Sequence, residues 1–383
     1  MMNFDFEPRT RLVCGHDAID QLGQLARGLG IHRALVITDP GIVAAGHVQR
    51  GLDSLRKCSI DAMLFDGARE NPTTDDVDAG LKMALRYGPE LLVGLGGGSS
   101  MDCAKGVNFL YSNGGKIEDY WGVGKADKEM LPMIAVPTTA GTGSEMQSFA
   151  LISDAVTHVK MACGDPKASF RVAILDPLLT LTQPTQVTAL TGIDAISHAV
   201  ETYVTKRRNP ISLMFSRESF RLLAGNFQHV INDPEYVDAR ASMQLGAAYA
   251  GLAIENSMLG AAHALANPLT AEFGIPHGQA VGVMLPHVVR FNGKKYNSWY
   301  QELVSMIETM PGGVATGKGA YGLADFLAQL LRAAGLEDKL EPLGVTREDF
   351  PRLAASAAKQ WTGSFNPRRV DSESLQQLYE QAY

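Results

Sequence analysis

The sequence is poor in cysteine, and its few cysteines are scattered. Only four are present in 383 residues, and no two of them form a CxxC pair; they are Cys14, Cys58, Cys103 and Cys163. Disulfide frameworks and thiolate zinc sites depend on closely spaced or paired cysteines, so neither is expected here. We predict reduced and mostly buried thiols, because free cysteine is among the residue types most often buried.

The sequence also lacks a basic surplus and long apolar runs. It has 34 Lys and Arg residues against 41 Asp and Glu residues, and its one dense basic cluster, 206–208, is short. Such a chain offers little to neutralise phosphates, which argues against a nucleic-acid partner. No apolar run is long enough to span a bilayer, and residues 1–10 carry Asp5 and Glu7 in place of an apolar signal segment. We therefore expect no membrane partner and a cytoplasmic location.

The order of apolar patterns predicts two domains. Short apolar runs separated by helix-length stretches are typical of βαβ units with a parallel sheet, and they occur at 33–38, 62–65, 90–95 and 133–136. From about Pro184 the chain is rich in Ala, Leu, Met and Gln, which favours successive helices. We predict an α/β dinucleotide-binding domain at 1–183 and an all-helical domain at 184–383. The glycine-rich segment 311–322 is predicted to be a mobile connection.

A glycine-rich turn follows the predicted strand at 90–95. Gly96, Gly97, Gly98 and Ser99 stand between this strand and a helix-forming stretch, with Ser and Asp side chains available as N-caps. Glycine lets backbone N–H groups approach an anion, and a helix N-terminus adds unpaired donors, so a cofactor pyrophosphate would fit there. The segment Gly94-x-Gly96-x-x-Ser99 only resembles the dinucleotide fingerprint. A tight strand-to-helix turn without a ligand is the alternative.

A second loop, rich in glycine and threonine, follows the strand at 133–136. It runs from Pro137 to Glu145 and carries hydroxyl groups at Thr138, Thr139 and Thr142. In an open α/β sheet the loops at the carboxyl ends of the strands line the ligand crevice. The presence of two such loops in one domain strengthens the prediction of a nucleotide site. The threonine hydroxyls are suited to hydrogen-bond a phosphate, a ribose or a carboxamide.

Asp39 ends the first of the predicted strands, just before Pro40 and Gly41. A carboxylate at this place accepts hydrogen bonds from the adenosine ribose and repels a 2′-phosphate. This interpretation favours NAD over NADP. The alternative is that Asp39 only begins an Asx turn before Pro40.

Four side chains offer a set of metal ligands. Asp194 and His198 are four residues apart in a predicted helix and so share one face, although a simple ion pair has the same spacing. His263 lies among small apolar residues that imply burial, and His277 stands in a predicted rigid turn at 274–278. Each histidine alone is more often structural. One carboxylate and three imidazoles together suit Fe²⁺ or Zn²⁺ better than Ca²⁺ or Mg²⁺.

These motifs together resemble the signatures of the iron-containing alcohol dehydrogenases. The matching segments are Gly96-Gly97-Gly98-Ser99-x-x-Asp102-x-Ala104-Lys105, Pro137-Thr-Thr-Ala-Gly-Thr-Gly-Ser-Glu145, Gly192-x-Asp194-Ala-x-x-His198 and Pro276-His277-Gly278. They occur in the expected order from Asp39 to the Leu285-Pro286-His287 segment. Several long motifs in register make coincidence implausible.

The resemblance implies a fold, a cofactor, a metal and an oligomer. The fold is an α/β dinucleotide-binding domain followed by an all-helical metal-binding domain, as in the dehydroquinate-synthase-like group. The metal, Fe²⁺ ahead of Zn²⁺, is implied at Asp194, His198, His263 and His277. NAD contacts are implied at Asp39, Gly97, Gly98, Ser99, Asp102, Thr138, Thr139 and Thr142, with Lys160 on the nicotinamide side. A homodimer or a higher homo-oligomer is also implied.

Asn267 is the one departure from the resembling family that bears on catalysis. Members often carry a second histidine at this position, four residues after His263, and this histidine is credited with proton transfer. An amide does not titrate near neutral pH, so here Asn267 is expected to hydrogen-bond substrate or water. His287 and a water chain are the alternatives for moving the proton. Asn267, His263 and His277 are the residues expected at the catalytic centre.

The expected reaction is the interconversion of a small primary alcohol or diol and its aldehyde. A divalent ion supplies Lewis acidity that favours loss of the alcohol proton, and hydride passes from the carbinol carbon to C4 of NAD. The flanking residues expected around the substrate are apolar, which favours an uncharged one: Phe149, Leu252, Ile254, Leu259 and Phe273. The alternatives are a glycerol dehydrogenase or a dehydroquinate-synthase-like lyase of the same fold, a metal-free maleylacetate-reductase-like enzyme, and a non-catalytic NAD-binding protein.

Overall fold

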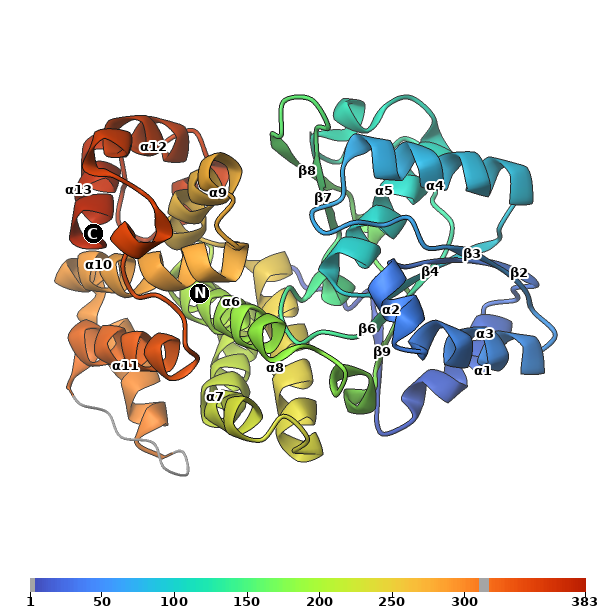
Figure 1. The fold of residues 1–383 in the computed structure, drawn as a ribbon, viewed down its shortest axis with the longest axis horizontal. Coiled ribbons are helices and arrows are strands. Elements are labelled where there is room, and N and C mark those ends of the chain that lie inside the picture. Colours follow the sequence, from blue (N-terminus) through green and yellow to red (C-terminus); the bar gives the residue numbers. More distant parts are fainter. Residues whose placement is uncertain (1–3, 310–316) are drawn as a thin grey trace. The chain divides into compact units, whose positions relative to one another are not determined.

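The computed structural model describes residues 4–309 and 317–383 of the chain. These residues form two compact units, which are shown in Figure 1. One unit is Glu7–Gln183, and the other consists of residues 4–6 together with the described residues of Pro184–Tyr383.

A parallel sheet is the centre of the unit Glu7–Gln183. In the described part of the chain it has six strands in the order β1-β9-β6-β4-β2-β3, and every adjacent pair is parallel. The strands are β1 (Arg11–Cys14), β2 (Arg33–Ile37), β3 (Asp61–Phe65), β4 (Leu91–Gly96), β6 (Met133–Pro137) and β9 (Val172–Leu175). The predicted parallel sheet is thus confirmed, although its edge strand β1 was not predicted.

A smaller sheet that the sequence did not indicate lies in the same unit. It has the order β5-β8-β7, with β5 (Gly122–Val123), β7 (Phe149–Ser153) and β8 (Lys160–Gly164). Strands β7 and β8 pair antiparallel. Both strands contain half-buried residues and Leu151 of β7 is exposed, so this sheet is less deeply buried than the central strand β4.

Helices cover both faces of the parallel sheet (Figure 1). They are α1 (Leu22–Gly28), α2 (Pro40–Ala44), α3 (His47–Lys57), α4 (Thr74–Tyr87) and α5 (Gly98–Asn113). Alternate strand residues such as Val36, Val93 and Val136 form one buried cluster with Leu22 of α1 and Leu55 of α3. Helices α4 and α5 lie on the opposite face, so both faces of the central strands are buried, as parallel sheets require.

The strand order reverses between β2 and β4. The chain passes from β2 outward to β3, while β4 pairs with the other side of β2. Helix α3 follows β2 on one face of the sheet, and α5 follows β4 on the other (Figure 1). Loops that diverge in this way open a crevice at the carboxyl ends of the two strands, which is where open α/β sheets bind ligands.

The unit that begins at Pro184 is helical, as predicted, and no strand occurs among its described residues. Its helices are α6 (Thr185–Val204), α7 (Pro210–Asn232), α8 (Val237–Asn256), α9 (Ala261–Phe273), α10 (His277–Ile307), α11 (Gly319–Ala333), α12 (Phe350–Ala357) and α13 (Ser372–Gln381). Helix α6 is buried from Gly192 to Val204, which makes it the central helix of this unit.

Two local predictions in this unit were wrong. His277 does not stand in a turn: Pro276 is the N-cap of α10 and His277 is its first residue. The predicted mobile connection at 311–322 lies partly outside the described residues, and its part from Gly319 onward belongs to helix α11. Proline fixes φ near the value that a helix start needs, so a Pro-His-Gly sequence suits a helix N-terminus as well as a turn.

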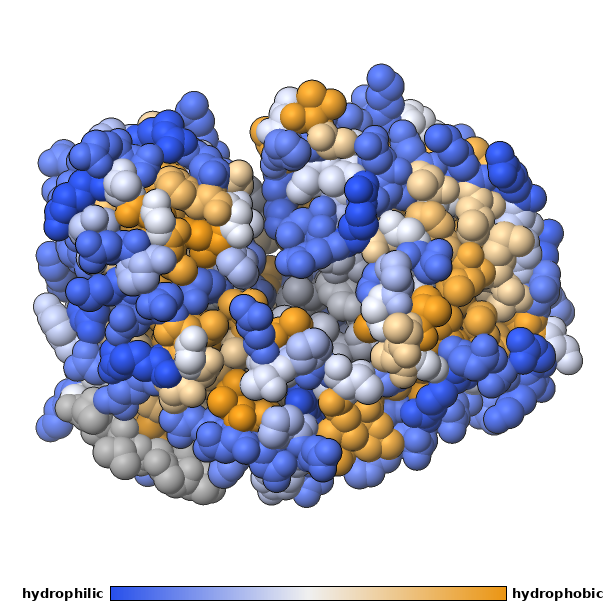
Figure 2. Space-filling model, in the orientation of Figure 1, coloured by the Kyte–Doolittle hydropathy of each residue, from blue (hydrophilic) through white to orange (hydrophobic). Residues whose placement is uncertain are grey.

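The face of the described chain that Figure 2 presents is mainly polar. Figure 2 shows hydrophilic residues over most of one face, with apolar residues in separate patches. No helix among the described residues is long and apolar enough to cross a membrane. The prediction of mostly buried cysteines holds for Cys103 and Cys163 but is wrong for Cys14, which is exposed, and for Cys58, which is half-buried.

Candidate active site

The glycine-rich turn after β4 leads directly into helix α5. Gly97 is the N-cap of α5, and no side chain caps its first turn, so the predicted Ser or Asp cap is wrong. Gly96 has φ +148°, and a Cβ there would lie 2.4 Å from Ser100 Oγ, so only glycine fits. The first N–H groups of α5 are therefore left for water or a ligand.

The threonine-rich loop after β6 packs against this turn. Thr138 N donates to Gly96 O at 2.9 Å. A Cβ on Gly98 would lie 2.6 Å from Thr142 Cγ2, so glycine also permits this close approach. Thr138 Oγ1 is buried and has no hydrogen-bond partner in the described structure. The two predicted nucleotide loops thus form one surface, with an unused hydroxyl within it.

Asp102 lies in a buried charged cluster that holds the two loops together. Ser144 Oγ donates to Asp102 Oδ1 at 2.6 Å. Lys105 Nζ donates to Ser144 Oγ, to Ser144 O and to Phe149 O at 2.7 to 2.8 Å. It lies 3.6 Å from Asp102 Oδ1. Burial raises the pKa of Asp102, although Lys105 and Ser144 oppose the shift. Asp102 therefore connects α5 to the second loop through its Oδ1 atom.

Asp39 has two structural partners at the end of β2. It is the N-cap of α2 and accepts from Ile42 N at 3.1 Å. Ser100 Oγ donates to its second oxygen at 3.2 Å. The helix-capping alternative is thus present in the structure. The carboxylate is half-buried, and its bond to Ser100 places it beside the glycine-rich turn.

Ser99 and Lys160 share one neighbour, Asn71. Asn71 N donates to Ser99 Oγ at 3.2 Å, and Lys160 Nζ donates to Asn71 Oδ1 at 3.0 Å. Asn71 follows β3 and has φ +52°, a conformation that asparagine tolerates better than most residues. The structure therefore brings Lys160 of β8 to the first nucleotide loop, and it does so through a residue that sequence reasoning missed.

The predicted metal ligands come together from three helices of one unit. Asp194 and His198 lie on α6, His263 on α9 and His277 on α10. Asp194 Oδ1 is 3.4 Å from His198 Nε2, 3.4 Å from His263 Nε2 and 3.8 Å from His277 Nε2. The ligand atoms of Asp194, His263 and His277 all lie within 4.8 Å of one another. Three Nε2 atoms thus lie within 3.8 Å of one carboxylate oxygen, although His198 is outside the group in which every ligand atom is within 4.8 Å of the others.

Gly278 explains how α10 brings His277 to this cluster. A Cβ on Gly278 would lie 2.1 Å from the carbonyl oxygen of Leu190 on α6. The first turn of α10 therefore packs directly on the backbone of the helix that carries Asp194 and His198. A glycine after His277 is what permits this contact.

The donor set fits a divalent transition-metal ion. Asp194 Oδ1 and His263 Nε2 are both buried, and neither has a hydrogen-bond partner among the residues that the structure describes. Buried polar atoms without a partner are rare, and a shared cation would satisfy both. Ligand atoms of a four-coordinate metal with bonds of about 2.1 Å lie roughly 3.4 Å apart, which agrees with the closest separations.

The electrostatics of the cluster also favour a cation. Burial opposes ionisation of Asp194, yet the adjacent histidines, with His198 contributing most, hold the pKa of Asp194 below its usual range. Burial by itself lowers the pKa of His263, but Asp194 and Glu201 raise it to about 9. The carboxylates of Asp194 and Glu201 therefore favour a positive charge in this cluster. A divalent ion would supply that charge without protonation of His263.

Glu201 is a residue of this cluster that the sequence analysis missed. It is buried, and its carboxylate accepts from His263 Nδ1 at 2.6 Å. Glu201 lies seven residues after Asp194 and three after His198, so helical periodicity places all three on one face of α6. That spacing was the signal available in the sequence.

Asn267, at the position of the family's proton-transfer histidine, and His287, an alternative for moving the proton, differ in their surroundings. Asn267 is half-buried on α9 and donates to Gln360 Oε1 at 2.9 Å. Burial, aided by the charge of Arg290, lowers the pKa of His287 to about 4. A histidine with that pKa is neutral at pH 7 and is poorly matched to proton transfer near neutrality.

Comparison with known proteins identifies the family. The model of the iron-containing alcohol dehydrogenases matches residues 8–177, and that of the C-terminal part of the Fe-containing alcohol dehydrogenase family matches residues 188–383. The chain is 33% identical to 1,3-propanediol dehydrogenase of Citrobacter freundii over 382 residues, covering 99% of each chain. It is 31% identical to NAD-dependent methanol dehydrogenase of Bacillus methanolicus, covering 100% of each.

Solved structures agree with the sequence relatives. The crystal structure of 1,3-propanediol oxidoreductase matches with a TM-score of 0.94 at 32% identity, covering 100% of both chains. The chain therefore belongs to the iron-containing alcohol dehydrogenase family. It is an oxidoreductase that acts on CH–OH groups.

Proposed function

We propose that this alcohol dehydrogenase oxidises a small primary alcohol or diol with NAD and requires one divalent metal ion. The observation that carries the proposal is the approach of three Nε2 atoms to Asp194 Oδ1, two of them at 3.4 Å and one at 3.8 Å. In this proposal Asp194, His198, His263 and His277 hold the ion. A bound ion would supply the Lewis acidity that favours deprotonation of the alcohol, and NAD would take the hydride.

The metal is proposed to be Fe²⁺, with Zn²⁺ as the alternative. An Asp and three His side chains accept both ions, and affinity alone does not decide between them. The family description supports iron. Ca²⁺ and Mg²⁺ are disfavoured because they prefer oxygen ligands.

NAD is proposed to bind at the loops that follow β2, β4 and β6. The uncapped N-terminus of α5, reached through Gly96, Gly97, Gly98 and Ser99, suits the pyrophosphate. The buried Thr138 hydroxyl is available to the cofactor, with Thr139 and Thr142 in the same loop. Asp39 is proposed to meet the adenosine ribose and to disfavour NADP, and Lys160 to lie on the nicotinamide side. The name of the methanol dehydrogenase relative supports NAD.

Asn267 is proposed to orient substrate or water through its amide and not to carry a proton. Its side chain donates a hydrogen bond to Gln360. Because Asn267 follows His263 by four residues, the two side chains lie on the same face of α9, about one turn apart. The proton is then proposed to leave through water, because the pKa of His287 lies too low for that residue to take it up near pH 7.

The substrate class is proposed from the relatives. 1,3-propanediol dehydrogenase, NAD-dependent methanol dehydrogenase and lactaldehyde reductase are all among them. A small primary alcohol or diol is common to the first two names. We further propose that residues 7–183 form the cofactor-binding domain and 184–383 the metal-binding domain. A cytoplasmic location and a homodimeric or larger assembly remain predictions.

The test is a reconstitution assay. The protein is stripped of metal under anaerobic conditions and given NAD, a panel of primary alcohols and diols, and Fe²⁺, Zn²⁺ or no ion. We expect NADH formation with one ion and no activity without metal. Preferred oxidation of glycerol would favour the glycerol dehydrogenase alternative. Binding of NAD and metal without oxidation of any alcohol would contradict the proposal and favour a non-catalytic NAD-binding protein.

A further inference from the structure

Glu201 contacts both the imidazole of His263 and the start of the helix that carries it. Its Oε2 atom accepts from His263 Nδ1 at 2.6 Å and from Gly260 N at 3.0 Å, and its Oε1 atom accepts from Ala262 N at 2.7 Å. Gly260 is the N-cap of α9. One buried carboxylate on α6 thus satisfies two N–H groups at the N-terminus of α9 and one ring nitrogen of His263.

The carboxylate fixes the tautomer of His263. An ionised carboxylate only accepts hydrogen bonds, so the His263 Nδ1 atom beside it must carry the proton. The lone pair of the neutral ring then lies on Nε2, the atom 3.4 Å from Asp194 Oδ1. A metal ligand needs this arrangement, and a carboxylate on the far nitrogen also increases the basicity of the imidazole.

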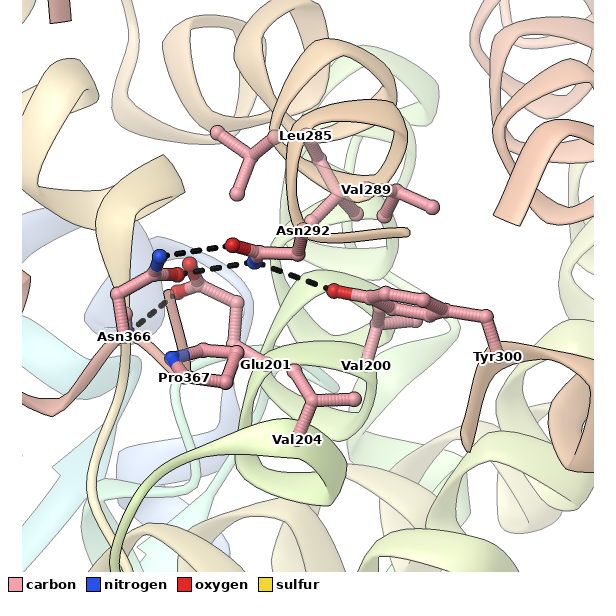
Figure 3. A pocket seen from close by; sticks show the side chains of 11 residues that line it. Val200, Glu201, Val204, Leu285, Val289, Asn292, Tyr300, Asn366 and Pro367 are labelled. Atoms are coloured by element: carbon pink, nitrogen blue, oxygen red, sulfur yellow. Dashed lines mark hydrogen bonds between the residues drawn. The ribbon is translucent and has the colours of Figure 1, made fainter. Parts of the chain in front are cut away.

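A polar network lies beside Glu201 and also contacts the start of α9. Figure 3 shows Glu201 beside Asn366, Asn292 and Tyr300, whose side chains point toward one another between apolar residues. Asn366 and Asn292 exchange two hydrogen bonds at 2.8 and 3.0 Å, and Asn292 Nδ2 donates to Tyr300 Oη at 3.2 Å. Asn366 Oδ1 also accepts from Ala261 N at 3.4 Å. The start of α9 is therefore held by Glu201 and Asn366 together.

A close packing contact limits movement of this carboxylate. A Cβ on Gly260 would lie 2.8 Å from Glu201 Oε1, so the carboxylate packs directly against the α9 backbone. Glu201 itself is 3% exposed. The position of His263 relative to Asp194 and His198 is therefore tied to a buried, closely packed contact between α6 and α9.

We propose that Glu201 is a positioning residue for the metal centre, which presents His263 Nε2 to the ion and joins the helix of His263 to the helix of Asp194 and His198. The inference rests on the proposed metal-binding function. Glu201 is not a ligand: its two oxygens are taken by His263 and the first N–H groups of α9. Its contribution is to shape the site before metal binds.

The test measures metal affinity, which does not depend on enzyme turnover. E201Q keeps the size of the side chain but replaces one acceptor oxygen by a donor. If the amide nitrogen faces His263, the ring proton must move to Nε2, where it blocks the metal; if it faces Ala262 N, two donors collide. We expect the dissociation constant of Zn²⁺ or Co²⁺, measured by chelator competition, to rise by roughly 10- to 100-fold. The visible absorption bands of bound Co²⁺ should also shift.

Glu302 provides the matched control. It is a glutamate in the same unit that accepts a hydrogen bond from Tyr203, and E302Q makes the same chemical change without touching a histidine. E302Q should bind Co²⁺ with the wild-type affinity and spectrum. If metal-free E201Q does not fold, E201D replaces it, because a carboxylate one methylene shorter does not reach His263 and the α9 N–H groups together; it should show the same loss.

The outcomes separate the inference from the function on which it rests. Wild-type protein that binds no divalent ion would overturn the proposed metal site itself. Wild-type protein that binds metal, with folded E201Q or E201D binding it within twofold of wild type and with an unchanged Co²⁺ spectrum, would overturn only the role of Glu201. Equal loss of affinity in E302Q would overturn it as well.

Discussion

Lys105 and Ser144 form a buried double contact between the two nucleotide loops. Lys105 Nζ donates to Ser144 Oγ at 2.7 Å and to Ser144 O at 2.8 Å. A third bond to Phe149 O uses its remaining donor. Lysine is rarely buried without acceptors for its protons, and here the lysine side chain is fully buried. The contact fixes the threonine-rich loop against helix α5.

Lys105→Met should therefore weaken both stability and NAD binding. The change leaves Asp102 buried beside an apolar side chain and leaves the acceptors of Ser144 and Phe149 without their donor. We expect the free energy of unfolding to fall by about 3 kcal/mol. The NAD dissociation constant of the folded protein, measured by calorimetry, should rise by about tenfold or more. Lys82→Met, at an exposed lysine of α4, is the control and should change neither. An unchanged NAD affinity in Lys105→Met would mean that the contact serves only stability.

Glu145, next to Ser144, should make stability depend on pH. Burial raises the pKa of Glu145 from 4.5 to about 7, although Lys105 opposes the shift. Between these values the folded state keeps the proton and the unfolded state has lost it, so stability should fall as pH rises from 4.5 to 7. Glu145→Gln removes this dependence. We measure the free energy of unfolding in urea for both proteins at pH 4.5 and at pH 8. The stability of Glu145→Gln relative to wild type should be higher at pH 8 than at pH 4.5 by up to about 3 kcal/mol. Parallel pH curves for the two proteins would contradict the assignment.

Gly278→Ala should disturb the metal cluster without changing a ligand. The new methyl group would meet the carbonyl oxygen of Leu190 and push the first turn of α10 away from α6. Overpacking of this kind costs about 1 to 3 kcal/mol. Because His277 is the preceding residue, we expect weaker metal retention on dialysis as well as a lower melting temperature. Gly28→Ala, where the added methyl group meets open space, should leave both unchanged. Wild-type metal retention in Gly278→Ala would show that His277 does not depend on this packing.

Asp39→Gly should relax the discrimination against NADP. It removes the carboxylate beside the glycine-rich turn, while glycine replaces the helix cap at a cost of only a few tenths of a kcal/mol. We expect the NAD/NADP ratio of kcat/KM to fall by roughly tenfold, since a like charge near the 2′-phosphate is lost. Asp39→Asn, which keeps the cap and removes the charge, separates the two roles. A ratio that stays at the wild-type value in both variants would leave Asp39 with the capping role alone.

The sequence predicted the parallel sheet and the helical unit because both follow from simple periodicity. Buried strands such as β4 are continuous apolar runs, and α6 is a long, mostly apolar helix with Asp194 and His198 on one face. The β7–β8 hairpin was missed; its strands are less deeply buried than β4, with half-buried residues in both and Leu151 exposed. The start of α10 was mistaken for a turn because proline followed by glycine is typical of both.

The residues that support the site were harder to predict than those proposed to form it. Asp194 and His198 share a helix, and His263 and His277 were added because one carboxylate and three imidazoles together make a metal-ligand set. The resemblance to a family then implied the same four residues. Glu201 lies on the same helix face as Asp194 and His198. This spacing does not predict that its carboxylate contacts His263, which is 62 residues away. Asn71 comes from a loop with no motif at all. Such partners depend on tertiary packing, which local sequence does not encode.

The most direct measurement is the metal content and activity of His263→Ala beside wild type. Both proteins are reconstituted anaerobically with Fe²⁺ or Zn²⁺, passed through a desalting column, and assayed for bound metal and for NADH formation from a primary alcohol. The account predicts about one ion per wild-type chain with activity, and a folded His263→Ala protein that retains little metal and forms no NADH. Stoichiometric metal and full activity in His263→Ala would remove this residue from the ligand set and contradict the proposed metal centre.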